Sequence, residues 1–369
     1  MATFSRPIQV DQRSAIRNLD WTLLGSAALL LFIGLVSLFS IGHRDGEPYL
    51  KKQVAMAVIG LVPFALFFFA PADLWRRFAS VLYGLNVIML AAVLKVGSSA
   101  NGAQRWIDLK FMQFQPSELA KLLVVLTLSS FLVARADQIK KPSTFLLSFL
   151  HVGVPAVLIA LQPHYGGALV LVVIWLGISL AAGVPFRFIA CAVILLGFAA
   201  VLAVKVPGAF HGYHLKRLKA MARPDKSGAS WQQDRAQVAL AAGGIFGTGL
   251  GKGTQHLPEQ QNDFIFTVLG EELGLAGCTL ILTAFGFFFY RLWLAFVRTK
   301  DLFGRAVIAG ILSLLAIHTM INIGMVIGLF PVIGLWLPFM SAGGSSLWLC
   351  MACVALALNL RRREKALLF

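Results

Sequence analysis

The chain of 369 residues contains few charged residues and very few acids. Charged side chains make up 13% of the sequence, and only 16 residues are Asp or Glu. A typical soluble domain carries about 25% charged residues. Hydrophobic residues make up 58% of the chain, and 29 residues are Phe. Because no water-soluble fold could bury this much apolar surface, the composition excludes a soluble enzyme, a secreted disulfide scaffold, a coiled coil and a disordered chain. It predicts an all-α, polytopic membrane protein.

Cysteine is also rare, and its spacing matches neither a zinc site nor a redox motif. The four cysteines lie in apolar runs, so we expect them to be small core residues: Cys191, Cys278, Cys350 and Cys353. His211 and His214 are close together, but no third ligand lies nearby in the sequence. The sequence therefore predicts no metal site built from histidine and cysteine.

Ten apolar runs are candidates for membrane-spanning helices. They fall at about 21–42, 53–70, 78–97, 117–134, 144–162, 165–183, 186–207, 264–290, 306–328 and 336–360. Residues 183–185 (Gly-Val-Pro) predict a tight turn between the sixth and seventh runs. No cleavable signal pattern precedes the first run. We therefore predict one integral membrane domain over residues 1–369, with ten transmembrane helices.

The distribution of basic residues predicts the orientation. A net charge of +16 would suggest a nucleic-acid partner in a soluble protein. In a membrane protein it fits Lys and Arg on the cytoplasmic side and attraction to anionic lipid, so no nucleic-acid partner is expected. With the N-terminus inside, the inner segments carry 17 basic residues and the short outer loops carry 5. Both termini are therefore predicted to be cytoplasmic.

The longest connection, residues 208–262 between the seventh and eighth runs, is then extracytoplasmic. Connections of this length are commonly functional. Within it, residues 231–242 are typical of a short amphipathic helix, and glycines recur from Gly243 to Gly253. The glycines fit neither a Walker A loop, because no Ser or Thr follows Gly251-Lys252, nor the dinucleotide fingerprint. A turned loop at the membrane surface is favoured, and backbone amides along a phosphate path are the alternative.

The few acids near predicted spans are candidate functional residues. Asp263 opens the eighth run, where it could cap the helix or act in a site. Glu271 and Glu272 come two turns later, and an acid inside a span must pair, face the bundle interior or serve a pathway. Positions 263 and 271 are expected to share a helix face, so Asp263 and Glu271 could line one cavity.

Two further segments carry polar residues at predicted span ends. Glu118 and Lys121 are three residues apart in the first turn of the fourth run, which favours an intrahelical ion pair over a contact with a polar site. Arg105, in the preceding outer segment, fits surface anchoring or ligand binding equally well. The last outer turn holds Gly, Pro and Ser, including Ser341 and Ser345. It is expected to be a kinked helix start, or else to present amides and hydroxyls to a ligand.

Four blocks in this order resemble the SEDS proteins, the RodA and FtsW family of bacterial cell-wall polymerases. They are GAQRWIDL (102–109), FQPSELAK (114–121), LPEQQNDFIFTVLGEELGL (257–275) and NIGMVIGLFPVIGLWLPFMSAGGSS (322–346). The resemblance covers the chain from the first run to the C-terminus, and the RodA (elongation) branch fits the length better than the FtsW (division) branch.

The resemblance implies a peptidoglycan glycosyltransferase of the bacterial inner membrane that joins lipid II units into glycan strands on the outer face. Asp263 matches the family's essential aspartate and would act as general base or help to hold a divalent cation such as Mg²⁺. The resemblance also suggests substrate-binding roles for a further set: Arg105, Glu118, Lys121, Arg217, Ser341 and Ser345. The implied partners are a class B penicillin-binding protein, which is a transpeptidase, and the elongation machinery.

The sequence departs from the family pattern at several positions. The usual Gln-Pro-Asp reads Gln162-Pro163-His164, which weakens a cation site built on that acid. The usual Tyr-Gly-Gly-Ser has Ala342 in place of its Tyr, and a frequent Gln-Ser pair appears as Arg235-Ala236. A carrier that moves a lipid-linked precursor across the bilayer is the alternative function. It would need a polar route through the whole membrane, whereas an enzyme needs its polar groups at one face.

Overall fold

A computed structural model describes residues 19–100, 103–108, 113–205 and 229–366, and these are almost entirely helical. The helices are α2 (Trp21–Asp45), α3 (Tyr49–Phe69), α4 (Ala72–Arg77), α5 (Ala79–Val96), α6 (Pro116–Val133), η1 (Ala136–Gln138), α7 (Pro142–Leu161), α8 (Tyr165–Ala182), α9 (Phe186–Lys205), α11 (Ala229–Ala242), α12 (Ile265–Arg298), α13 (Leu302–Val326) and α14 (Gly344–Ala366).

Eight of these helices are long and apolar enough to cross a membrane: α2, α3, α6, α7, α8, α12, α13 and α14. Shorter apolar stretches occupy residues 79–95 of α5 and 186–198 of α9. The predicted all-helical membrane fold is confirmed, and each predicted run overlaps one of these ten helices. Ten complete crossings stay a prediction. Of the predicted long loop, residues 208–228 lie outside the described part of the chain, as do Arg217, His211 and His214.

One element was not predicted. A small antiparallel sheet, in the order β1 (Ser98–Ala100), β2 (Ala103–Asp108) and β3 (Gln113–Phe114), precedes α6. Within it, Ser99 pairs with Gln104 and Ile107 pairs with Phe114. The Asn-Gly dipeptide at 101–102 is the short-range hairpin signal that could have indicated this sheet.

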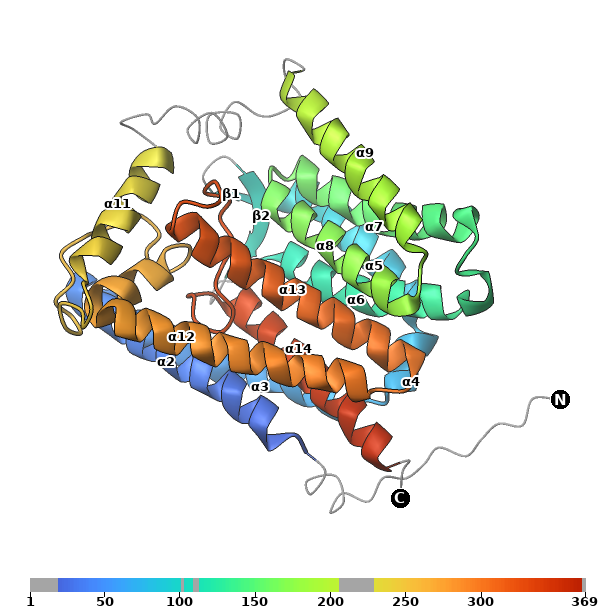
Figure 1. Cartoon of the computed structure of the whole chain (residues 1–369), viewed down its shortest axis with the longest axis horizontal. Coiled ribbons are helices and arrows are strands. Elements are labelled where there is room, and N and C mark those ends of the chain that lie inside the picture. Colours follow the sequence, from blue (N-terminus) through green and yellow to red (C-terminus); the bar gives the residue numbers. More distant parts are fainter. Residues whose placement is uncertain (1–18, 101–102, 109–112, 206–228, 367–369) are drawn as a thin grey trace.

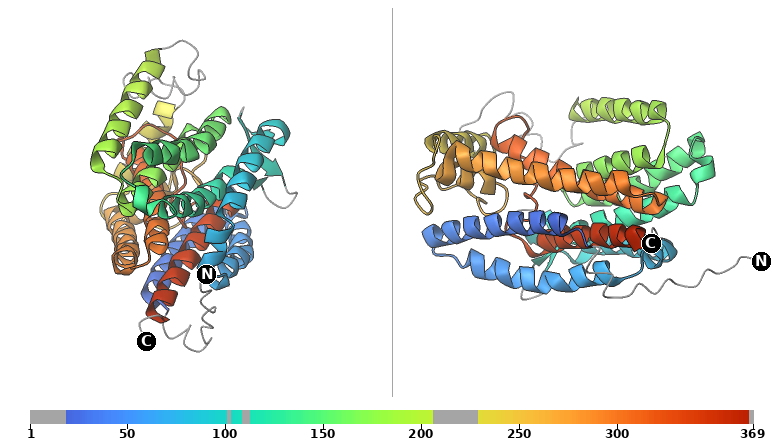
Figure 2. Two further views of the ribbon diagram at one scale, coloured as in Figure 1. Left: turned by 90° about the vertical axis from the view of Figure 1, so that its right-hand side faces the viewer. Right: turned by 60° about the horizontal axis from the view of Figure 1, so that its bottom comes forward.

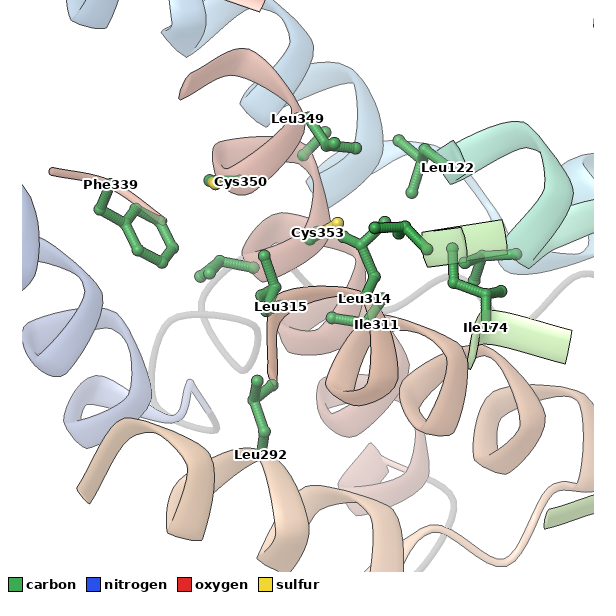
Figure 3. Close-up of a cluster of buried hydrophobic side chains, with 14 of the residues drawn as sticks. Leu122, Ile174, Leu292, Ile311, Leu314, Leu315, Phe339, Leu349, Cys350 and Cys353 are labelled. Atoms are coloured by element: carbon green, nitrogen blue, oxygen red, sulfur yellow. The ribbon is translucent and has the colours of Figure 1, made fainter. Parts of the chain in front are cut away.

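The helices form layers around a central apolar core. Figure 2 shows α2 and α14 lying between α3 and α12, and Figure 1 shows α13 crossing beside α8 and α6. The core side chains come from several helices at once, including Leu122 on α6, Ile174 on α8, Leu292 on α12 and Leu314 on α13 (Figure 3). Most of α6 is buried, so this helix is enclosed by protein and its first turn is held rigidly.

The cysteines divide between the core and the surface. Cys350 and Cys353 are fully buried on α14, as predicted (Figure 3). The prediction is wrong for Cys191, which is exposed on α9, and only half right for Cys278, which is partly buried. In a membrane protein an apolar neighbourhood does not indicate burial, because apolar residues also cover the lipid-facing surface.

Helix α12 is broken at Gly274, whose backbone has φ 66° and ψ −162°. The break frees backbone groups on both sides, and the glycine-rich loop at residues 243–253 binds them. The amides of Thr248 and Gly249 donate to the carbonyls of Glu271 and Glu272, at 2.9 and 3.0 Å. In return, the amides of residues 275 and 276 donate to the carbonyls of residues 244 and 245. The predicted turned loop is thus a backbone brace on α12.

Two polar contacts join α2 to α12 about one membrane thickness apart. Near one end, Arg291 donates to both carboxylate oxygens of Asp20 at 2.8 Å. Burial alone would raise the pKa of Asp20, but hydrogen bonds from Thr22, the Leu23 amide and Arg291 hold that pKa below its ordinary value. Near the other end, the Ser40 hydroxyl donates to the Glu272 carboxylate. Twenty helical residues rise about 30 Å, which is the hydrocarbon thickness of a bilayer.

The broken helix predicts that Gly274→Ala destabilises the protein. Only glycine adopts this backbone conformation readily, and an added Cβ would overlap the Gly247 amide and the Ile245 carbonyl. We expect a loss of about 1–3 kcal/mol in the free energy of unfolding, measured by thermal denaturation in detergent. Gly286→Ala is the control in the same helix, because its Cβ would meet no atom within 4 Å. Equal stability of the two variants would contradict the claim that the hydrogen bonds between the glycine-rich loop and the α12 break stabilise the protein.

Candidate active site

Asp263 lies at the entrance to α12. Residues 258–264 form turns, the helix begins at Ile265, and Phe264 occupies the N-cap position with no side-chain capping bond. The alternative in which Asp263 is simply the N-cap residue of α12 is therefore not what the structure shows. The Asp263 side chain is half-buried, in contrast to the fully buried carboxylates of Glu271 and Glu272.

The backbone around Asp263 is clamped from two sides. From α13, the Asn322 side-chain amide donates to the carbonyl oxygens of Asp263, at 2.9 Å, and Leu335, at 2.7 Å. From the segment before α14, the Ser341 hydroxyl donates to the Asn262 carbonyl at 2.6 Å. The Ala342 amide donates to the Gln261 carbonyl at 2.8 Å. Three successive carbonyls are thus fixed, which restricts where the Asp263 carboxylate can move.

Both serines of the last turn act as braces in this structure. Ser341 is 4% exposed, and besides its bond to Asn262 it accepts the Leu337 amide at 2.8 Å. The Ser345 hydroxyl accepts the Gln115 amide at 3.0 Å, which ties the start of α14 to the start of α6. Of the two alternatives for this turn, these contacts favour a kinked helix start. Direct substrate contact by these hydroxyls stays a proposal.

A second polar cluster is buried beside α6. Lys121 donates to Glu118 at 2.7 Å, and the two side chains are 0% and 2% exposed. The indole of Trp336 donates to the other Glu118 oxygen at 3.1 Å. Lys121 also lies 3.2 Å from His318 Nε2, and this nitrogen must accept because an ammonium group has only donors. The predicted ion pair is confirmed, and it is part of a larger site.

Helix α13 and the segment before α14 connect this cluster to Asp263. His318 and Asn322 are one turn apart on α13, so they lie on the same helix face. His318 stacks on Trp336 with 3.8 Å between ring centroids. Asn322 donates to the carbonyl of Leu335, the residue that precedes Trp336. The sequence analysis missed both α13 residues. The signal that could have found them is a polar side chain inside an apolar span.

His164, the residue at the departure from the family pattern, belongs to the α6 side of the site. It is 6% exposed, and its Nδ1 lies 3.3 Å from the side-chain nitrogen (Nε2) of Gln115 and 3.4 Å from the Ser117 hydroxyl. These contacts place His164 at the start of α6, one turn before the Glu118–Lys121 pair. An imidazole there packs against the Gly167 backbone, where an added Cβ would overlap the ring.

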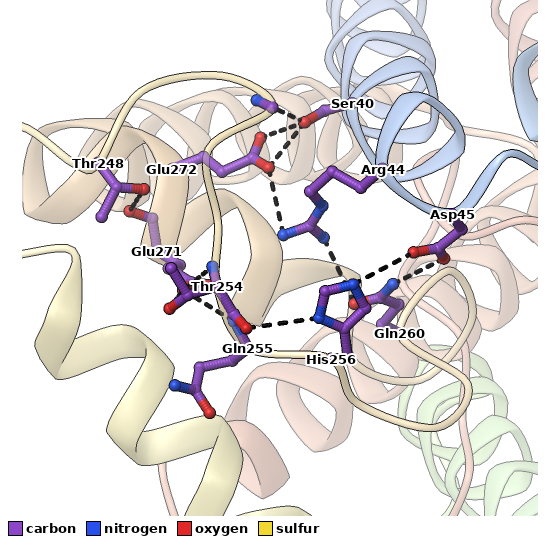
Figure 4. A network of polar contacts seen from close by, with 11 residues as sticks. Ser40, Arg44, Asp45, Thr248, Thr254, Gln255, His256, Gln260, Glu271 and Glu272 are labelled. Carbon is purple, nitrogen blue, oxygen red and sulfur yellow. Dashed lines mark hydrogen bonds and ion pairs between the residues drawn. The ribbon is translucent and has the colours of Figure 1, made fainter.

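Glu271 and Glu272 hold the loop that follows the glycines (Figure 4). Glu271 Oε1 accepts the Thr254 amide at 2.7 Å and the Gln255 amide at 3.1 Å. Glu272 binds Ser40 and lies 3.6 Å from Arg44. Glu271 is 1% exposed, and its carboxylate is occupied by these loop amides. That it lines one cavity with Asp263 stays a prediction. A buried carboxylate needs several hydrogen-bond donors, and here the backbone amides of the loop provide them.

The remaining predicted residues are only partly placed. Arg105 lies on β2 and is half-buried, while Arg217 is outside the described residues. Within the described ranges, no group of three or more His, Cys, Asp and Glu side chains could hold a metal ion. The side chains seen here do not form a complete cation cage around Asp263.

A family model described as a cell cycle protein, FtsW/RodA/SpoVE, matches residues 19–366. The chain belongs to this family. The match covers nearly the whole chain, so the resemblance carried by the four sequence blocks is confirmed. The blocks at 257–275 and 322–346 supply the residues that fix the Asp263 backbone, and those at 114–121 and 322–346 supply the Glu118–Trp336 contact. These three family segments therefore meet in one region of the fold.

Known members of the FtsW/RodA/SpoVE family are similar to this chain over almost their full length. The probable peptidoglycan glycosyltransferase FtsW of Trichlorobacter lovleyi is 35% identical over 357 residues, covering 92% of both chains. The peptidoglycan glycosyltransferase MrdB of Escherichia coli K12 is 33% identical, covering 95% of both. One solved structure, from work on how a peptidoglycan synthase complex coordinates polymerization and crosslinking, superposes with a TM-score of 0.82. It shares 29% identity and covers 94% of this chain and 98% of that one.

The buried cluster predicts that Lys121→Met is strongly destabilising. The substitution leaves the Glu118 carboxylate buried without its cation, which costs about 3–5 kcal/mol. The double variant Glu118→Gln/Lys121→Met should recover most of this loss, because Gln can still accept from Trp336. Chemical denaturation of the purified protein measures the free energy of unfolding of the unchanged chain, the single variant and the double variant.

Lys52→Met provides the matched control for the buried pair. Lys52 pairs with Glu47 at 3.6 Å, but both side chains are well exposed, so its loss should change stability by no more than about 1 kcal/mol. If the double variant is as unstable as Lys121→Met alone, the uncompensated charge is not the cause of the loss.

Proposed function

We propose that this protein is a peptidoglycan glycosyltransferase that joins lipid II units into glycan strands. Its relatives named peptidoglycan glycosyltransferase match 92% and 95% of the chain. The observation that carries the proposal is the Asp263 carboxylate, which is half-buried and whose backbone is clamped by Asn322, Ser341 and Ala342. Such rigid placement is what a catalytic carboxylate needs.

In the proposed reaction, Asp263 is the general base. It takes the proton from the acceptor sugar hydroxyl while that oxygen attacks the anomeric carbon of the donor. The bond between that carbon and the lipid pyrophosphate breaks, and the pyrophosphate leaves with the electron pair. A positioned carboxylate that acts as general base raises the rate of such a reaction about 10²–10⁴-fold. Arg105 and Arg217 are the proposed cations that meet the charge on the leaving group.

Glu118 and Lys121 have a positioning role in this proposal. Their buried side chains support Trp336 and, through it, the segment that carries Leu335 and Ser341. Asp263 is also the residue that would help to hold a divalent cation such as Mg²⁺, which would supply positive charge to the leaving pyrophosphate. Magnesium typically takes one or two carboxylates together with substrate phosphates, so a full protein cage is not required. The general-base step does not depend on this ion.

We infer an orientation with both termini in the cytoplasm and the site on the extracytoplasmic face of the bacterial inner membrane. The 17-to-5 distribution of basic residues supports it. Exposed Trp21, Tyr290 and Trp293 cluster near the Asp20–Arg291 contact, as expected for an aromatic belt at one membrane interface. Asp263 lies toward the opposite end of α12.

The placement of charge favours an enzyme over a carrier of lipid-linked precursors. In the helices that the structure describes, every Asp, Glu, Lys and Arg lies within about two turns of a helix end, so the middle of each span is uncharged. A carrier would need a polar route through that middle layer. The class B penicillin-binding protein partner is proposed from the family and from the synthase complex similar to this chain. The elongation branch is likewise proposed, and the length of the chain supports it. The FtsW and MrdB relatives match almost equally and do not distinguish the two branches.

Asp263→Asn should abolish lipid II polymerisation while leaving the fold intact, because Asn keeps the size but cannot take the proton. Gel analysis of glycan products, made by the full chain with its penicillin-binding partner, measures the activity. Glu47→Gln is the control, since it removes an exposed carboxylate from the loop between α2 and α3. Normal glycan synthesis by the Asn variant would refute the catalytic assignment, and facilitated movement of lipid II across vesicles would favour the carrier.

Asn322→Ala should lower turnover about tenfold or more with little change in lipid II affinity, because freeing the Asp263 carbonyl lets the carboxylate shift. Asn359→Ala is a close control. Asn359 is equally buried and also donates to two backbone carbonyls, those of Phe67 and Ala70, far along α14. Both variants should lose similar stability. If turnover per folded molecule falls equally in both, Asn322 has no special positioning role.

A further inference from the structure

The glycine-rich loop presents large apolar side chains to its surroundings. Phe246 is 84% exposed, Ile245 is 63% exposed and Leu250 is 53% exposed. Glycines with positive φ at 244, 247 and 249 separate them, so the loop turns tightly and holds the side chains outward. Exposed apolar patches of this kind mark contact with a membrane or with another protein.

The depth of this loop follows from the two α2–α12 contacts. Asp20–Arg291 and Ser40–Glu272 are separated by 20 residues on α2 and 19 residues on α12. At about 1.5 Å per residue this is about 30 Å, the thickness of the hydrocarbon core. Because ionised side chains are excluded from that core, the two contacts mark its two boundaries. Ser40 and Glu272 therefore lie at the boundary on the side of the glycine-rich loop.

Backbone hydrogen bonds fix the loop at that boundary. The Gly251 amide donates to the Ser40 hydroxyl at 2.9 Å, which places Leu250 at the level of Ser40. The Ala276 amide donates to the Ile245 carbonyl at 3.0 Å, which places Ile245 and Phe246 about one turn deeper than Glu272. Figure 1 shows this loop beside the ends of α2 and α12.

The neighbouring surface of α12 already faces lipid. Leu275 is 63% exposed, and Leu280 and Leu282 follow it with 59% and 48% exposure. The apolar tip of the loop therefore continues the lipid-contacting face of a spanning helix. Lys252, which is exposed next to the tip, completes the mixture of apolar and basic side chains that favours a membrane interface.

We propose that residues 245–250 insert into the lipid leaflet at this boundary and anchor the loop there. The apolar side chains of the loop would then contact lipid at the level where headgroups meet acyl chains. Since the loop is bonded to both sides of the Gly274 break, the anchor also sets the height of the α12 start relative to the membrane. The inference does not depend on the reaction proposed above.

Site-specific fluorescence tests this anchor in the full chain reconstituted into phospholipid nanodiscs. Cys191 and Cys278, which are not fully buried, are first changed to Ala. Phe246→Cys and, separately, Leu250→Cys are then labelled with a small environment-sensitive fluorophore. Quenching is measured with lipids that carry a nitroxide at a shallow or a deep acyl carbon in both leaflets, and with iodide in the water.

Two further positions calibrate the result. Leu282→Cys lies about 15 Å below the Glu272 boundary and should be quenched best by the deep nitroxide. Glu47→Cys is exposed in the α2–α3 connection and should be quenched by iodide alone. We expect the probes at 246 and 250 to be quenched roughly twofold or more by the shallow nitroxide and to be protected from iodide. If the probes at 246 and 250 were quenched by iodide alone, like the probe at 47, the proposal would be overturned. Protection from iodide that appears only when a partner protein is added would also overturn it.

Discussion

The structure depends on satisfying every buried backbone group inside a bundle that offers almost no water. This constraint acts most sharply at the break in α12. The Gly274 backbone ends the regular hydrogen-bond ladder, and the carbonyls of Glu271 and Glu272 would be left unpaired in an apolar setting. The amides of Thr248 and Gly249 bind them. The loop is rich in glycine because its backbone must approach the helix backbone so closely that side chains would collide.

The same constraint explains how a few polar side chains organise the site. Asn322 uses both hydrogens of one amide to bind two carbonyls from segments that lie before α12 and before α14. Glu118 accepts from one cation and one indole, so both of its oxygens are paired. Each of these side chains holds several non-helical segments at once. A site built in this way keeps its shape because moving any one segment would leave a buried polar atom unpaired.

Local rules predicted those features that depend on neighbours in sequence. The apolar runs, the Glu118–Lys121 pair and the special position of Asp263 all follow from spacing within one segment or from a family motif. The contacts that complete the site could not be predicted in this way. Lys121 and His318 are 197 residues apart, and Asn322 is 59 residues from Asp263. The contacts of Glu271 could not be predicted either, because its partners, Thr254 and Gln255, reach it only through the loop that binds the Gly274 break.

Membrane geometry gives the site a height that suits a lipid-linked sugar. If Glu272 marks the hydrocarbon boundary, Asp263 lies beyond it. The helical residues from Ile265 to Glu272 rise about 10 Å, and the two steps from Asp263 to Ile265, which lie before the helix, add at most about 7 Å. The polar headgroup layer is roughly 5–8 Å thick on each side of a bilayer. A pyrophosphate attached to a lipid tail lies in that layer, and its sugar projects beyond it into water. A carboxylate at the height of Asp263 would therefore be within range of the sugar, and in the described helices the middle of each span carries no Asp, Glu, Lys or Arg.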